Sequence, residues 1–384
     1  MPPQLFSISL ILLILSCCCS GLAIPSSSIV TGANGFVGRH IVHALLIQQR
    51  QCDDVIICLV RDGKVKCEQS YWDAYLSDLK ESEQCLVKVL PYDMLDDGST
   101  LRSALQAAST SSPSSKICVY HTASVFGPTE DPVQTANDNV KSAEVVVEAM
   151  QQFILPARLV LTSSMAAVRA TNQTPLNNKY YTNKDWNTLS TLDPNNWGSC
   201  YQYSKAESER RASKLVAKCP NDLEFIALCP SFVFGPPPPL PKQLQSQSSL
   251  IKQWLSGASQ VQSRLCVDVR DVAKAHIAAG QMDLGDSNDH KRYILSTEAR
   301  LSSELTGEAL KRAVEQHLRK SGSSSNIDTS KITCDTVFDG GAIKIGNKEV
   351  ECTDILRDEL GVTCRSVDET FYDMVVAMLA GESF

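Results

Sequence analysis

The sequence predicts an α/β fold in which helices cover both faces of a parallel β-sheet. Short apolar runs alternate with helical stretches from residue 28 onward. Several runs, such as residues 54–60 (DVIICLV), are continuously apolar and rich in β-branched residues, as expected for strands buried on both faces. A helix between each pair of strands implies right-handed crossovers and therefore a parallel, doubly wound sheet. The 384 residues suffice for such a sheet and a second lobe.

The elements follow one another in a regular order. Six strands are expected at 28–31, 54–60, 86–90, 116–121, 158–162 and 224–228. Helices are expected at 37–48, 101–108, 139–150 and 204–218. The run 235–239 (GPPPP) cannot continue a helix or a central strand, so the chain leaves the sheet there.

The N-terminus has a composition of its own. Residues 5–15 (LFSISLILLIL) are almost wholly apolar, and small residues follow at 20–23. This pattern is typical of a secretory signal peptide and is short for a spanning helix. We therefore expect residues 1–23 to be cleaved, leaving no stable membrane span, and the protein to enter the secretory pathway or be secreted. No Lys or Arg precedes Arg39, so an uncleaved anchor, or an apolar extension ahead of a cytoplasmic protein, stays an alternative.

Composition excludes some classes of function. The net charge of −7 gives no electrostatic support for binding nucleic acid. None of the 15 cysteines forms a C-x-x-C pair, so no metal site is expected. Cys58, Cys118 and Cys229 fall in strand-like runs and are expected to be buried thiols.

A glycine-rich turn joins the first strand to the first helix. Residues 31–38 read TGANGFVG. Gly32 permits a tight turn, Gly35 lets the backbone approach a pyrophosphate, and Gly38 allows the helix to pack closely on the strand. The helix N-terminus offers N–H groups and a positive dipole end to an anion. This context predicts a Rossmann-type dinucleotide site.

The end of the second strand bears on the choice of dinucleotide. A cation there accepts the 2′-phosphate of NADP, whereas an acidic residue binds the 2′-hydroxyl of NAD. Arg61 lies at this point and favours NADP(H). Asp62 follows it, so NAD(H) stays open.

A Tyr-x-x-x-Lys pair provides candidate catalytic residues. Tyr201 and Lys205 lead into a strong helical sequence, where a spacing of four puts both side chains on one face. Tyr180 and Lys184 have the same spacing in an Asn-rich stretch with little helical tendency. A nearby ammonium is expected to lower the pKa of Tyr201, which could then exchange a proton with a carbonyl or an alcohol.

A hydroxyl donor at the same oxygen would stabilise the developing charge. Ser164, at the end of the fifth strand, is the preferred donor, and Ser163 is the alternative.

Taken together, these motifs resemble a known family. TGANGFVG, HTAS at 121–124, TSS at 162–164, YQYSK at 201–205 and VDVRDVAKAHIAA at 267–279 resemble an extended short-chain dehydrogenase/reductase of the NAD-dependent epimerase/dehydratase superfamily. Within it, the likeness is to the dihydroflavonol reductase, cinnamoyl-CoA reductase and ketone reductase branch. The resemblance implies catalysis by Ser164, Tyr201 and Lys205.

The resemblance also implies a set of cofactor contacts. The glycine turn would line the pyrophosphate, Asp93 and Met94 would flank adenine, and Asn139 would hold a water near the lysine. The full set that it implies is Gly32, Gly35, Phe36, Val37, Gly38, Arg61, Asp93, Met94, Ala123, Asn139, Lys205 and Pro230. Two features depart from the family pattern: Cys229 stands where R-P-x-x-V-[FY]-G-P has arginine, and 333–348 looks like an insertion.

The resemblance implies an NADP-binding domain at 27–235, to which 265–298 returns. Residues 236–264 and 299–384 would form a smaller, discontinuous substrate lobe. The expected function is NADP(H)-dependent interconversion of a carbonyl and a secondary alcohol on a small hydrophobic substrate. A sugar-nucleotide epimerase or dehydratase of the same fold, and a non-catalytic NADP-binding protein, are the alternatives.

Overall fold

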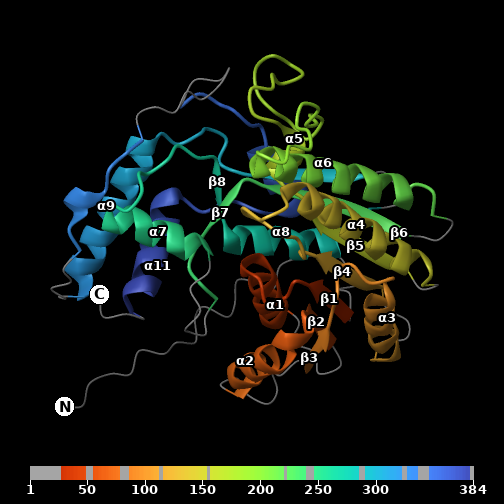
Figure 1. Ribbon diagram of the computed structural model, residues 1–384. Coiled ribbons are helices and arrows are strands. Elements are labelled where there is room, and N and C mark those ends of the chain that lie inside the picture. Colours follow the sequence, from red (N-terminus) through yellow and green to blue (C-terminus); the bar gives the residue numbers. More distant parts are fainter. Residues whose placement is uncertain are drawn as a thin grey trace, which may run out of the picture.

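The computed structural model shows a large sheet domain beside a smaller helical lobe (Figure 1). It describes residues 27–48, 55–77, 86–111, 116–153, 156–219, 223–238, 246–284, 290–321, 327–335 and 346–380. The expected signal peptide at 1–23 lies outside these residues, and so does most of the 333–348 segment. Among the described residues, no helix is both long and apolar enough to cross a membrane.

Seven parallel strands form the main sheet. They are β1 (Ser27–Thr31), β2 (Val55–Val60), β3 (Leu86–Pro91), β4 (Ile117–His121), β5 (Ala157–Thr162), β6 (Leu223–Pro230) and β9 (Lys291–Leu295). Their order is β3-β2-β1-β4-β5-β6-β9, which confirms the doubly wound parallel sheet. Successive strands are added on one side of β1 up to β3 and on its other side from β4 onward, and ligands bind at such a switch point between β1 and β4. The strand β9 at the edge was not among the six predicted strands.

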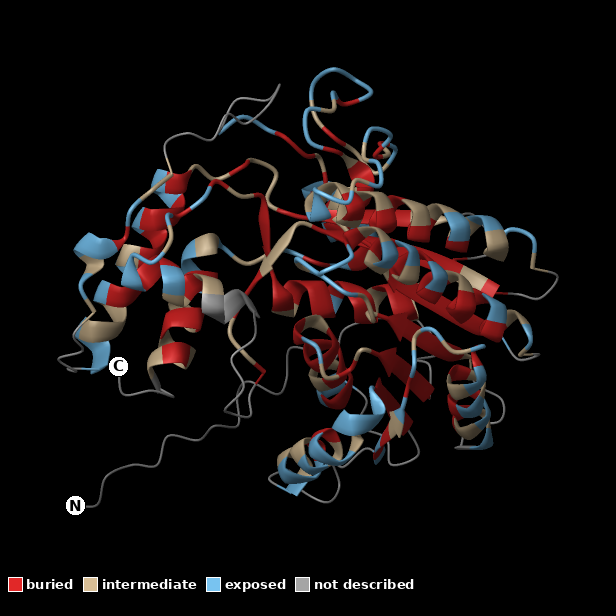
Figure 2. Ribbon diagram, in the orientation of Figure 1, coloured by how far each residue is buried: buried red, intermediate tan, exposed pale blue. Residues whose placement is uncertain are grey.

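Helices cover both faces of this sheet and bury its centre (Figure 2). On one face, α1 (Phe36–Gln48), α2 (Val65–Ser77), α8 (Val269–Gln281) and α10 (Thr353–Leu360) share an apolar cluster. On the other face lie α3 (Ser99–Ser111), α4 (Pro132–Gln151) and α6 (Trp197–Val216). The strands β1, β2 and β4 are buried along their whole length. The buried thiols expected at Cys58, Cys118 and Cys229 are confirmed.

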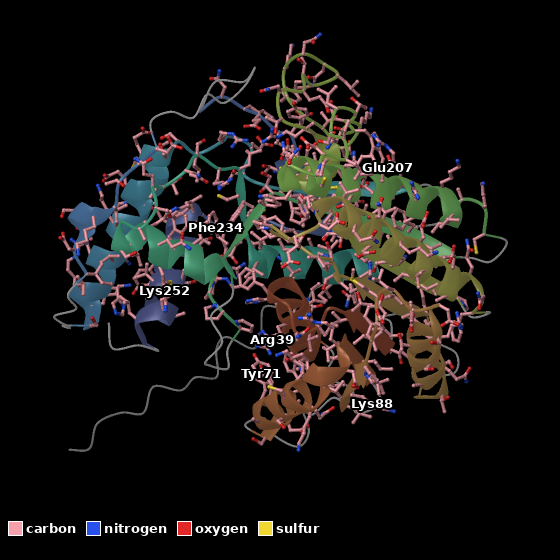
Figure 3. The ribbon with its side chains drawn as sticks, viewed as in Figure 1. Arg39, Tyr71, Lys88, Glu207, Phe234 and Lys252 are labelled. Carbon is pink, nitrogen blue, oxygen red and sulfur yellow. The ribbon has the colours of Figure 1, made fainter. Side chains whose placement is uncertain are left out.

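The smaller lobe has its own core. A two-stranded sheet of β7 (Phe232–Phe234) and β8 (Cys266–Asp268) leads to α7 (Ser246–Ser256), α9 (Ser303–Ser321) and α11 (Val367–Ala380). Phe234, labelled in Figure 3, packs its ring 5.2 Å from that of Phe371 and 5.9 Å from that of Trp254. Within the stretch 299–384, α10 instead packs on the sheet domain, because Leu356 and Leu360 join the cluster under α8.

Two helices begin earlier than their sequence pattern predicts. α4 starts at Pro132 because Asp131 caps it, accepting a hydrogen bond from Gln134 N at 2.8 Å. α6 starts at Trp197 because the Asn196 side chain accepts one from Ser199 N at 3.0 Å. Tyr201 therefore lies inside a formed helix. Three short helices, η1 (Asp62–Lys64), α5 (Met165–Val168) and η3 (Thr329–Lys331), complete the described elements.

Candidate active site

The glycine turn lies at the switch point of the sheet. Gly32 has a φ of +64°, which favours glycine, and a Cβ there would meet the Ala123 backbone at 3.0 Å. A Cβ on Gly38 would overlap the carbonyl oxygen of Gly32 and lie 2.9 Å from the Cα of Ala33. Gly35 N donates to Gly32 O at 2.8 Å, which closes the turn. The first N–H groups of α1 therefore point out of the turn without helical partners, as an anion site requires.

Phe36 and Val37 contribute backbone to this turn. The Phe36 side chain is buried and packs edge-on against His40, with ring centroids 5.5 Å apart. Val37 packs against the cluster that α1 shares with α8. Since both side chains face the core, only their N–H groups are available to a ligand.

The end of β2 presents two cations. Arg61 is exposed and precedes η1, where Lys64 N donates to Arg61 O at 2.7 Å. Lys64 is also exposed and was not among the residues predicted from sequence, although its spacing of three from Arg61 could have indicated it. Asp62 between them is exposed as well. Behind this edge, Arg39 of α1 is buried against α2, where its guanidinium lies 4.4 Å from the Tyr71 ring centre (Figure 3).

The other cofactor candidates lie along the carboxyl edge of the sheet. Asp93 is exposed and caps its own turn by accepting from Leu95 N at 2.9 Å, and Met94 packs against the cluster under α3. Ala123 N donates to Thr31 Oγ1 at 3.3 Å.

Asn139 and Pro230 are more deeply placed. The Asn139 side-chain amide holds both backbone groups of Val125, at 2.8 and 3.0 Å. The Asn139 carbonyl accepts a hydrogen bond from Ser208 of α6 at 3.1 Å. Pro230 is buried at the end of β6, paired with Leu295 of β9.

Ser164, Tyr201 and Lys205 come together at the carboxyl end of β5. The Ser164 hydroxyl lies close enough to the Tyr201 phenol to lower its pKa, and it also caps α5, accepting from Ala166 N at 3.1 Å. Lys205 Nζ donates to Thr162 O at 3.3 Å and lies 5.8 Å from the centre of the Tyr201 ring. A hydroxyl, a phenol and an ammonium thus share one corner.

Burial controls the proton affinities in this corner. It raises the pKa of Tyr201 to about 12, and the nearby Ser164 hydroxyl only partly opposes this rise. The expected lowering of this pKa by Lys205 is not seen, because the ammonium faces the tyrosine ring and Thr162 O. Burial also lowers the pKa of Lys205 to about 8, against the raising effect of Cys229 and Glu209. Tyr201 is therefore a protonated phenol at neutral pH.

The alternative residues lie elsewhere. Ser163 Oγ donates to the buried carboxylate of Glu209 at 2.6 Å, so its hydroxyl is engaged behind the site. Tyr180 and Lys184 lie in a loop, where a spacing of four does not align two side chains. The Tyr180 ring instead lies 5.1 Å from the ammonium of Lys348.

A small, open hollow lies beside Tyr201, lined by Val125, Gly127, Thr129, Pro132, Thr135, Ala136, Asn139, Trp197 and Tyr201. Phe126 forms part of its rim, with 53% of its surface exposed. Its ring lies 4.9 Å from that of Tyr201 and 5.8 Å from that of Trp197. These aromatic residues were not predicted from sequence, since no spacing signal links residue 126 to residue 197. Among the described residues, no three His, Cys, Asp or Glu side chains are placed to hold a metal ion.

The chain is similar to several known proteins. A model of an NAD-binding family described as male sterility protein matches residues 30–277. An uncharacterized oxidoreductase of Schizosaccharomyces pombe is 30% identical over 262 residues, covering 65% of this chain and 72% of that protein. The NADPH-dependent methylglyoxal reductase of Saccharomyces cerevisiae is 27% identical over 278 residues, covering 66% and 74%.

The same fold occurs in a solved structure of Gre2 from Candida albicans in complex with NADPH. It superposes with a TM-score of 0.72 at 24% identity, covering 93% of this chain and 99% of that one. The family match spans most of the sheet domain, including the glycine turn, Ser164, Tyr201 and Lys205. The chain therefore belongs to the extended short-chain dehydrogenase/reductase family.

Proposed function

We propose that this protein is an NADP(H)-dependent reductase that interconverts a carbonyl and a secondary alcohol on a small hydrophobic substrate. The observation that carries the proposal is the placement of Ser164, Tyr201 and Lys205 together at the carboxyl end of β5. Ligands bind at this edge in sheets of this type. The yeast methylglyoxal reductase that resembles this chain is NADPH-dependent, which supports the same chemistry here.

The residues around the glycine turn fit a dinucleotide phosphate. The backbone contacts of Gly32 and Gly38 leave no room for a Cβ, so the turn keeps the start of α1 close to β1 and β4. Its free N–H groups would bind the pyrophosphate. Arg61 and Lys64, both exposed at the end of β2, would bind a 2′-phosphate, which favours NADP(H) over NAD(H). When bound, NADPH would supply the hydride.

The protein side chains would manage the charge that forms on the carbonyl oxygen. As the carbon is reduced, that oxygen becomes strongly basic and needs a proton and hydrogen-bond donors. Tyr201 holds a proton at neutral pH because burial raises its pKa to about 12. The Ser164 hydroxyl lies beside that phenol, so it would be near the same substrate oxygen. Lys205, whose ammonium lies beside the Tyr201 ring, would bind the ribose of the nicotinamide.

The hollow beside Tyr201 supports a hydrophobic substrate. The Phe126 ring lies 4.9 Å from that of Tyr201 and 5.8 Å from that of Trp197, and Val125 also lines the hollow. Exposed aromatic rings that converge on a polar group are typical of small-molecule sites. A ketone or aldehyde with an apolar substituent would place its oxygen at Tyr201 and its substituent against these rings.

A single set of assays tests the proposal. Protein lacking residues 1–23 is titrated with NADPH and NADH by fluorescence, and NADPH oxidation is followed with a panel of ketones and aldehydes. We expect NADPH to bind more tightly than NADH, and Tyr201→Phe to abolish turnover while retaining NADPH. Turnover unaffected by Tyr201→Phe would refute the catalytic assignment. NAD that survives purification would favour the epimerase or dehydratase alternative.

A further inference from the structure

A buried carboxylate lies directly behind the proposed catalytic residues. Glu209 follows Lys205 by one turn of α6 and has no exposed surface. Its carboxylate accepts hydrogen bonds from Ser163 Oγ at 2.6 Å and from Arg292 Nε at 2.5 Å. A buried charge is tolerated when it is paired and hydrogen-bonded, and both conditions hold here. Arg292 and the neighbouring His290 and Ser163 keep the pKa of Glu209 low, at about 2, despite its burial.

Glu207 on the same helix provides a contrast. Its label in Figure 3 lies on the outer side of α6, away from the sheet. It pairs with Arg210 at 2.8 Å and Arg211 at 3.5 Å, and all three side chains are partly exposed. Exposed pairs of this kind contribute little to stability. Of the two glutamates, only Glu209 therefore has an environment built around its charge.

Arg292 connects this carboxylate to the loop that follows α5. Its guanidinium donates to Asn183 O at 3.2 Å and to Asp185 O, and lies 3.9 Å from the centre of the Trp186 ring. The next residue, Asn187, binds the backbone oxygens of α5 at 2.8 and 2.9 Å.

Ser164 caps the start of that short helix, so the contacts form a continuous path. The path runs from Glu209 through Arg292 and the loop to Ser164. Glu209 also accepts a hydrogen bond from Ser163, the residue directly before Ser164. The serine is therefore fixed from two directions by one ion pair.

Cys229 reaches the same carboxylate as Arg292, from the adjacent strand. Cys229 Sγ lies 3.6 Å from the Glu209 carboxylate. In the parallel ladder, Ala227 of β6 is opposite Arg292 of β9, and residues two apart on a strand point to the same face. Side chains at 229 and 292 thus reach the same carboxylate from adjacent strands. An arginine at either position could therefore pair with Glu209.

We propose that Arg292, paired with Glu209, is a positioning residue that orients Ser164 toward Tyr201. The proposal rests on the proposed function. It assigns Arg292 no contact with substrate or cofactor. Its effect is on the geometry of one hydroxyl, and a misplacement of about 1 Å can reduce a rate about 10²-fold.

A double-mutant cycle tests this route of action. We expect Arg292→Gln to lower kcat, while KM and the affinity for NADPH change little. Because Arg292 acts through Ser164, the double variant Ser164→Ala/Arg292→Gln should lose no more kcat than Ser164→Ala alone. Losses that multiply would overturn the proposal. Glu207→Gln, a surface change on the same helix, is the control and should leave kcat unchanged.

Moving the guanidinium provides the second arm. Cys229→Arg/Arg292→Thr places an arginine beside Glu209 from β6 and should recover much of the kcat lost in Arg292→Thr. Cys229→Ser/Arg292→Thr is the matched variant without a guanidinium and should not recover it. Thermal unfolding and NADPH titration first establish that Cys229→Arg/Arg292→Thr is folded and binds the cofactor. If its kcat is then as low as that of Cys229→Ser/Arg292→Thr, the proposal is wrong.

If these variants do not fold, Arg292→Lys serves in the cycle with Ser164→Ala. It keeps the charge but lacks the planar fork, so it should show a smaller, still non-additive loss. Absence of turnover in the wild-type protein would instead count against the proposed function, so the two failures are distinguishable.

Discussion

Replacing Gly38 with alanine probes how closely α1 must approach β1. A Cβ at this position would overlap the Gly32 carbonyl oxygen and lie 2.9 Å from the Cα of Ala33. Both obstacles are backbone, and the turn that carries them is closed by the hydrogen bond from Gly35 N to Gly32 O. No side chain can rotate away, so the helix start or the turn must move.

The expected magnitude combines two opposing effects. Alanine is favoured over glycine inside a helix by about 1 kcal/mol. Overpacking a tight contact costs about 1–3 kcal/mol, and a backbone obstacle places Gly38→Ala near the upper value. We therefore expect a net loss of stability of about 2 kcal/mol.

Gly63 offers a matched control on the same side of the sheet. A Cβ there meets nothing within 4 Å, and its φ is not in the left-handed region. Gly63→Ala should therefore be neutral or stabilising by up to about 1 kcal/mol. The two variants should differ in stability by about 2–3 kcal/mol and therefore in Tm by roughly 4–12 °C, given about 2–4 °C per kcal/mol for a domain of this size.

Two assays read the result. Thermal unfolding measures stability, and fluorescence titration measures NADPH binding, which should weaken in Gly38→Ala because the N–H groups of α1 are displaced. If Gly38→Ala unfolds at the wild-type temperature and binds NADPH equally well, the close approach of helix and strand is not needed. An equal fall in Gly63→Ala would show that the loss is not specific to this contact.

Three further outcomes are expected. Burial lowers the pKa of Lys205 to about 8, and the protonated form of Lys205 is the one required. We therefore expect kcat/KM for carbonyl reduction to fall as pH rises through about 8. A kcat/KM that does not change between pH 7 and pH 10 would contradict this. Arg61→Ala should weaken NADPH binding by about 10- to 100-fold, because charge-assisted hydrogen bonds are lost, and should leave NADH binding unchanged. Lys64→Ala should have a smaller effect on NADPH binding. Equal losses of affinity for both dinucleotides in titrations would refute a 2′-phosphate contact. Trp197→Ala and Phe126→Ala should each raise KM for apolar ketones by about tenfold through lost apolar contact, with NADPH affinity retained; unchanged KM values would place the substrate elsewhere.

The sheet was predictable from sequence because its signal is local. Residues 54–60 form an uninterrupted apolar run, and the structure buries β2 along its whole length. The helix caps were less visible, since Asp131 and Asn196 start α4 and α6 ahead of their apolar periodicity. The strand β9 was missed for a different reason. Its sequence, KRYIL, begins with two cations, which are unusual in a buried strand. Arg292 is buried because it forms an ion pair with Glu209 of α6.

The site residues also differ in how far they could be predicted from sequence. Spacing alone indicated the glycine turn and the pair Tyr201 and Lys205, because each depends on residues close in sequence. The choice between Ser163 and Ser164 depended on Glu209, 46 residues further on, which engages Ser163 and leaves Ser164 facing Tyr201. The aromatic rim also depends on a distant partner, since the Phe126 ring meets α6 only in the folded chain.

Cys229 and Arg292 show most clearly what spacing along the chain does not reveal. Ala227 of β6 is opposite Arg292 of β9, and the side chains of Cys229 and Arg292 both reach the Glu209 carboxylate. Positions 229 and 292 belong to no common motif, because only the register of the sheet brings their side chains to one point. The variant Cys229→Arg/Arg292→Thr tests this register directly, since arginine at 229 can replace arginine at 292 only if the two strands are aligned as described.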